Sequence, residues 1–132
     1  MKAFLGGLLG GLVVGALLTT IASRVIDSRR DHWPDAVMTV IAHEFGNLRE
    51  QSKQGQCASA ASTGALQRLQ LMAQDVVPAL NPAADDRVFG QYATDLGTAL
   101  AKVATAGADC RQTAAAVVEV GNACQACHRD YR

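Results

Sequence analysis

The chain has 132 residues, of which 49% are hydrophobic and only 5% aromatic. Ala, Leu and Val supply most of the apolar content, a composition that favours helices over strands. Twelve basic and twelve acidic residues cancel. The chain therefore lacks the basic surface that holds a phosphate backbone, and we expect it not to bind nucleic acid.

The first 23 residues predict a transmembrane helix. Residues 3–23 carry no charged side chain, and a helix of about 20 residues is long enough to cross a bilayer. Gly7, Gly11 and Gly15 recur at every fourth position, which forms a small-residue face that another membrane helix can approach closely. The alternative is a Gly-rich export signal that is cleaved after a weak site near Ala22. Both interpretations place the following domain outside the cytoplasm.

Residues 34–132, which follow a polar connector at 24–33, predict one all-α domain. Each of its four amphipathic segments begins or ends at a residue typical of a helix terminus, and Pro78 and Pro82 are expected to stop the second segment. Short links between the segments favour an antiparallel up-down-up-down four-helix bundle. The four helices are expected at residues 34–51, 62–77, 85–107 and 109–130.

Each expected helix has apolar residues at intervals of three and four, which assigns one face to the core. In chain order, these residues are Met38, Ile41, Ala42, Phe45 and Leu48; Leu66, Leu69, Met72, Val76 and Val77; Phe89, Tyr92, Leu96, Leu100 and Val103; and Val117, Val120 and Cys124.

A motif with defined chemistry lies in the last expected helix. Residues 124–128 read Cys-Gln-Ala-Cys-His, the C-x-x-C-H sequence that attaches c-type haem. On a helix, the thiols of Cys124 and Cys127 share one face and can add to the two vinyl groups of one porphyrin. His128 lies on the same face, where it can serve as the proximal iron ligand. A thioredoxin-type cysteine pair needs a βαβ setting, and a zinc site needs four ligands; the sequence offers neither. It therefore predicts one covalently attached haem c.

The end of the chain, VGNACQACHRDYR, resembles the signature of the cytochrome c′ family. Gly121 stands three residues before the first cysteine, and Tyr131 and Arg132 follow the histidine, as in that family. The segment AVMTVIAHEFGNL resembles the family's first helix, so the likeness spans roughly residues 33–132. It implies a four-helix bundle around one c-type haem, with Gly121, Tyr131, Arg132 and Phe45 near that haem. A missing side chain at Gly121 would let the porphyrin lie close to the backbone.

The resemblance assigns the distal side of the haem to Met38. Family members with Leu or Phe at the matching position keep a five-coordinate iron that binds nitric oxide or carbon monoxide. Low-spin members carry Met there and act as electron carriers, and this chain is closest to them. Met72 is the main competing ligand. His43 lies about 140° around the helix from Met38, so the two cannot face one iron together, and His32 precedes the helix.

Three functions are compatible with these residues. The preferred one is a c-type cytochrome tethered to the bacterial inner membrane by one helix, with its haem domain in the periplasm. It would carry single electrons to or from a respiratory or photosynthetic membrane complex. The glycine face would bind a helix of that complex or a second copy of the chain. The alternatives are a five-coordinate haem protein that binds nitric oxide or carbon monoxide, and a structural subunit with an incidental haem. We expect no enzyme, because no paired carboxylates, nucleophile triad or phosphate loop is visible.

Cys57 and Cys110 are predicted to form a disulfide. In an up-down-up-down bundle, the link after the first helix and the link after the third lie at the same end. Cys57 falls in the first of these links and Cys110 at the second, and an exported domain meets an oxidising environment. The alternative is two separate buried thiols.

Overall fold

The computed structural model describes residues 15–20, 32–80 and 86–131. The chain divides into two compact units, residues 1–32 and 33–132. In the first unit, residues 15–20 are helical. Across the described ranges, no helix has the length and apolar content of a membrane span. Most of the anchor expected at 1–23, most of the connector, Pro82 and Arg132 lie outside these ranges.

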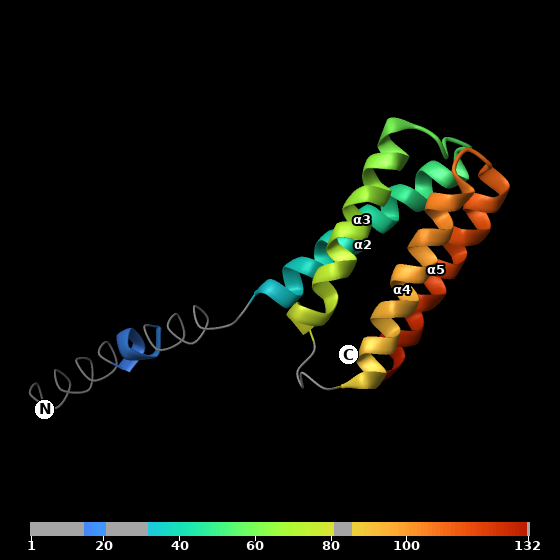
Figure 1. Ribbon diagram of the computed structural model, residues 1–132. Helices are drawn as coiled ribbons and strands as arrows, with labels where there is room; N and C mark the ends of the chain where they lie inside the picture. The colour runs from blue at the N-terminus through green and yellow to red at the C-terminus, as the bar shows by residue number, and fades with distance from the viewer. Residues whose placement is uncertain (1–14, 21–31, 81–85, 132) are drawn as a thin grey trace, which may run out of the picture. The chain divides into compact units, whose positions relative to one another are not determined.

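The second unit is a four-helix bundle made of α2 (Trp33–Lys53), α3 (Ala60–Leu80), α4 (Arg87–Ala106) and α5 (Cys110–Asp130). α2 packs against α3 and α5, and α4 packs against the same two helices, so the four form a closed ring. Successive helices run in opposite directions (Figure 1). The expected all-α, up-down-up-down bundle is confirmed.

The ends of α4 and α5 follow the local signals in the sequence. Asp86 caps α4, and its Oδ1 accepts hydrogen bonds of 3.0 Å from the backbone N–H groups of Val88 and Phe89. Asp109 caps α5 in the same way. Gly107 ends α4 with φ at 57°, in the left-handed region that glycine adopts without strain. These predicted helix ends are confirmed.

The expected end of the second helix at Pro78 is wrong, because α3 continues through Pro78 to Leu80. Proline removes one backbone donor and crowds the preceding turn, which is costly in a helix interior. Here only two residues follow Pro78, and its side chain is exposed. The proline therefore costs the helix little stability, because the helix ends within one turn of it. α3 also begins two residues earlier than expected, at Ala60.

Most of the residues expected inside are buried or half-buried, but the core face of α2 differs from the predicted one. Val37 and Glu44 are buried together with Ile41 and Leu48. Met38 and Phe45 lie half-buried beside this face, and Ala42 is exposed. On α3, Val77 was expected inside and is also exposed. The expected positions that are confirmed as buried are Ile41, Leu48, Leu69, Val76, Phe89, Leu96, Leu100, Val103, Val117 and Val120.

A charged residue belongs to the α2–α3 interface. Glu44 of α2 is 7% exposed, and Arg68 of α3 donates to both of its carboxylate oxygens, from Nε at 2.6 Å and from Nη2 at 2.9 Å. The hydrogen bonds from Arg68 lower the pKa of Glu44 despite its burial. This pair satisfies a carboxylate that would otherwise be costly to bury.

Candidate functional site

A cavity of about 560 Å³ lies between the helices at the end of the bundle where α5 terminates. Figure 1 shows that the α2–α3 pair and the α4–α5 pair lie farther apart at this end than at the opposite one. The cavity volume falls within the range of roughly 300–1,000 Å³ that is usual for small-molecule and cofactor sites. The lining comes from all four helices and is mainly apolar: Asp35, Met38, Thr39, Ile41, Ala42, Phe45, Val76, Tyr92, Ala93, Leu96, Ala123, Cys124, Cys127 and His128.

The two thiols and the imidazole of the C-x-x-C-H motif line this cavity together. α5 stays helical to Asp130, so the spacings of three and four residues keep the side chains of Cys124, Cys127 and His128 on one face. Burial raises the pKa of both thiols, and the charge of Asp130 adds to the effect at Cys127. Both groups are therefore protonated thiols at neutral pH.

Among the expected distal ligands, the structure brings only Met38 to the same cavity. Met72 packs against the core and does not line it. His43 is exposed and lies 3.2 Å from Asn47, measured between His43 Nε2 and Asn47 Nδ2. His32 is exposed and belongs to the first unit. One thioether from α2 thus shares the apolar space with one imidazole from α5.

Phe45 lines the cavity as well, and Gly121 makes room for it. A Cβ atom at Gly121 would lie 3.4 Å from Cζ of the Phe45 ring, at van der Waals contact, so the ring lies close to the backbone at Gly121. The sequence predicted that the space beside Gly121 would serve a porphyrin directly. In the structure the Phe45 ring lies beside Gly121, and the approach of a porphyrin to this backbone stays a prediction.

The end of α5 is held against the start of α4 by a cluster that the sequence did not predict. Tyr131 donates a hydrogen bond of 2.8 Å to Oδ2 of Asp86, and Tyr92 donates one to Oδ2 of Asp130. The Tyr131 ring packs edge-on against Phe89 and Tyr92, with centroids 5.2 and 6.1 Å apart. The hydrogen bond to Asp86 raises the pKa of Tyr131 to about 12, while the pKa of Asp86 is lowered. Tyr131 thus anchors the turn that carries the motif.

These residues fit a c-type haem. Two thiols and an imidazole project from the last turns of one helix into an apolar cavity, and a thioether reaches it from a second helix. In the described part of the chain, no group of three or more His, Cys, Asp or Glu side chains is placed to hold a metal ion without a porphyrin. The site therefore suits an iron carried by a porphyrin better than a bare metal ion.

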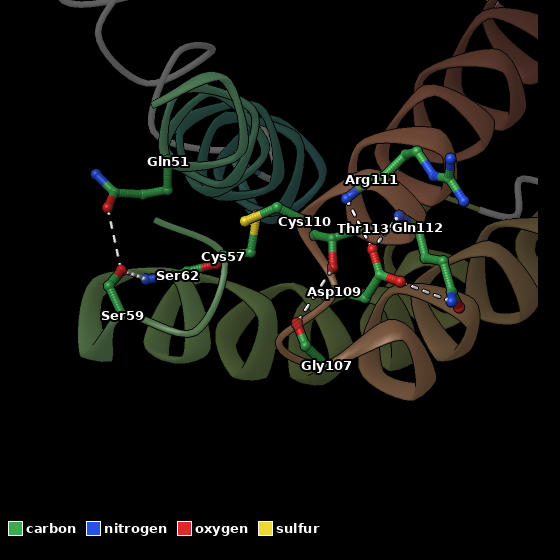
Figure 2. The surroundings of a disulfide bond; sticks show 10 residues. All are labelled: Gln51, Cys57, Ser59, Ser62, Gly107, Asp109, Cys110, Arg111, Gln112 and Thr113. Carbon is green, nitrogen blue, oxygen red and sulfur yellow. Dashed lines mark hydrogen bonds between the residues drawn. A yellow bond between two sulfur atoms is a disulfide. The ribbon is translucent and has the colours of Figure 1, made fainter. Parts of the chain in front are cut away.

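The other cysteine pair lies at the opposite end of the bundle. Cys57, in the α2–α3 link, and Cys110, at the start of α5, are joined by a disulfide with their Cα atoms 5.4 Å apart (Figure 2). Cys57 is buried. The haem motif and the disulfide therefore occupy separate ends of the domain.

Comparison with known proteins supports the fold. The structure is similar to the crystal structure of cytochrome c′ from Rubrivivax gelatinosus, with a TM-score of 0.62 and 22% sequence identity. The match covers 76% of this chain and 92% of that one. No protein-family model and no curated protein sequence matches the chain. The bundle in which the cavity lies is thus the fold of cytochrome c′.

Proposed function

We propose that the protein is a c-type cytochrome that carries single electrons. Cys124 and Cys127 would hold one haem c covalently, and His128 and Met38 would ligate its iron. The observation that carries the proposal is that these four side chains line one apolar cavity. The similarity of the fold to that of a cytochrome c′ supports it.

Each part of the site has a distinct role in this proposal. The thiols of Cys124 and Cys127 fix the cofactor to α5, and the helix orients the imidazole of His128. The thioether of Met38 closes the position that a gas or water would otherwise take, and the apolar walls exclude water. When bound, the haem supplies one-electron chemistry at its iron. A thioether ligand gives a higher reduction potential than a second imidazole, which suits a carrier between quinol-level donors and oxidase-like or photosynthetic acceptors.

The test is to express the full chain together with the machinery that attaches c-type haem. A denaturing gel stained for haem should show a coloured band at the mass of the chain, and acid-acetone should not extract the colour. Cys124→Ala and Cys127→Ala should each leave little coloured protein, because an empty cavity of this size is costly. Loss of the haem from the wild-type chain on extraction would refute the proposal.

The absorption spectrum separates the electron carrier from the second candidate, a five-coordinate haem protein that binds nitric oxide or carbon monoxide. A low-spin spectrum with a weak thioether-to-iron band in the far red supports electron transfer. A high-spin spectrum that changes when carbon monoxide is added supports gas binding. The presence of Met38 in the cavity favours the low-spin outcome.

We also propose that residues 1–23 anchor the protein in the bacterial inner membrane, with the haem domain in the periplasm. The supporting features are the uncharged run at 3–23 and the glycine face formed by Gly7, Gly11 and Gly15. That face would bind a helix of a larger electron-transfer complex, or a second copy of the chain, and would hold the haem near its redox partner. N-terminal sequencing of native protein tests the anchor: a mature chain that begins near Ser23 would disprove it. Gly11→Leu should release the protein from its complex and leave its spectrum unchanged.

A further inference from the structure

We propose that a groove between α2 and α5 is the docking surface for an acidic redox protein. The inference rests on the proposed electron-transfer function and adds the place of contact and the charge of the partner. The groove has a volume of about 460 Å³ and is lined by the C-terminal half of α2 and the middle of α5. The residues that carry the argument are Phe45, Arg49, Lys53, Val118 and Cys124.

The charge of the groove is positive. Arg49 and Lys53 line it, and its lining contains no carboxylate. Among the salt bridges of the described residues, none involves either cation. Three carboxylates adjoin the lining in sequence, and each has another partner: Glu44 accepts hydrogen bonds from Arg68, Glu50 accepts one from Gln54, and Glu119 accepts one from Lys102 of α4. Both positive charges are therefore available to a negatively charged partner.

The floor of the groove is apolar. Val118 is 62% exposed, and Ala114, Val117 and Gly121 lie along the same stretch of α5. An apolar centre with charged residues at its edge is the usual composition of a protein docking surface. The charges guide the partner and set its orientation, while the apolar centre loses water on contact. A small inorganic anion would use only the charges, so the composition favours a protein.

The groove adjoins the haem site through two residues. Phe45 and Cys124 line both the groove and the cavity. A protein in the groove would therefore touch Cys124, one of the two residues proposed to hold the haem. A second surface hollow, lined by Cys124, Gln125, His128 and Arg129, continues from the groove along α5. In the proposed exchange one electron passes between the iron and the partner's redox centre, so that one is oxidised as the other is reduced.

The test compares two double charge reversals in the full-length holo-protein. Arg49→Glu with Lys53→Glu changes the groove. Arg87→Glu with Arg111→Glu makes the same change in net charge at the first turns of α4 and α5, at exposed residues outside the groove lining that form no salt bridge. The probe is fluorescently labelled poly-L-glutamate, whose binding is followed by fluorescence anisotropy at low ionic strength. The groove variant should bind at least about tenfold more weakly than wild type, and the control variant less than about threefold more weakly. Added salt should weaken wild-type binding.

A second measurement tests whether bound acidic chains reach the electron route. Reduced holo-protein is oxidised by tris(phenanthroline)cobalt(III) with and without unlabelled poly-L-glutamate, which should slow the wild type and have little effect on the groove variant. Equal weakening of binding in both double variants would mean that only the overall charge matters, and would overturn the proposal. Binding in the groove without slower oxidation would overturn it as well. The anisotropy measurement needs no haem. A chain that binds no haem would therefore contradict the proposed function, while the binding of poly-L-glutamate to the groove could still be measured.

Discussion

The hydroxyl of Tyr131 donates a hydrogen bond of 2.8 Å to Oδ2 of Asp86, a residue 45 positions earlier in the chain. The other oxygen of the same carboxylate caps α4 by accepting from Val88 and Phe89. The carboxylate of Asp86 thus caps the start of α4 and also holds the residue that follows α5. Because Tyr131 follows His128 by three residues, this contact fixes the turn that carries the proposed proximal ligand.

Tyr131→Phe should therefore destabilise the domain in a pH-dependent way. The folded protein raises the pKa of Tyr131 to about 12, above the value of about 10 in an unfolded chain. The contribution of the hydroxyl is then fully present below pH 10 and is lost between about pH 10 and 12. Urea unfolding should show the wild type more stable than the variant at pH 8, with the difference shrinking above pH 10. A difference that stays constant to pH 12 would contradict this account. Tyr92 is present in both proteins, so its ionisation affects both equally and does not change the difference in stability.

At low pH the same contact should weaken through Asp86. The hydrogen bonds from Phe89 and Tyr131 lower the pKa of this carboxyl. A lowered pKa means stability that is present above the unfolded value and is lost as the pH falls through the folded one. Asp86→Asn should therefore cost stability at pH 7 and progressively less as the solution is acidified, measured by the same unfolding experiment.

Met38→Leu should convert a low-spin haem into a high-spin one. The thioether of Met38 lines the cavity of the C-x-x-C-H motif, and leucine keeps the apolar volume without offering an iron ligand. Carbon monoxide should then bind to the reduced variant and not to the wild type, as read from the absorption spectrum. Met72→Leu is the matched control, because Met72 packs in the same domain and does not line the cavity. A spectrum unchanged in Met38→Leu would assign the sixth ligand to another residue.

Arg68→Leu should destabilise the protein more than Glu44→Leu. Glu44 is buried and Arg68 is half-exposed, so the arginine can regain water when its partner is removed, whereas the carboxylate cannot. Without Arg68, the largest cause that lowers the pKa of Glu44 is lost while burial still raises it, so this pKa should rise. The loss of stability in Arg68→Leu should then be large at pH 7 and smaller near pH 4, where Glu44 can be protonated. Thermal unfolding at the two pH values measures it, and an equal loss at both would be inconsistent with a buried charge.

The sequence predicted the features that depend on neighbouring residues. Asp86, Asp109 and Gly107 mark helix ends because each acts on backbone groups within a few positions. The spacing within residues 124–128 likewise places three side chains on one helix face before any tertiary contact is known. Short links between four amphipathic segments then restrict the topology to a bundle.

The features that the sequence did not predict depend on distant partners. The rotation of α2 buries Val37 and Glu44, which differs from the core face that the apolar spacing predicted. The contact with Arg68, 24 positions later, satisfies the carboxylate of Glu44 that this rotation buries. In the same way, nothing near Gly121 in sequence indicates that the Phe45 ring lies beside it. Packing between helices decides both cases.

The disulfide between Cys57 and Cys110 should stabilise the domain without affecting the haem. The bond joins residues 53 positions apart, and the Cα atoms lie 5.4 Å from each other. A loop of this size is expected to contribute about 4 kcal/mol by restricting the unfolded chain. Alkylation of the native holo-protein without reduction, followed by mass measurement, should modify no cysteine, whereas two modified cysteines would mean that no bridge forms. Cys57→Ala with Cys110→Ala should lower the unfolding temperature. Its absorption spectrum should match that of the wild type, because Met38, His128 and the cavity involve neither cysteine of the disulfide.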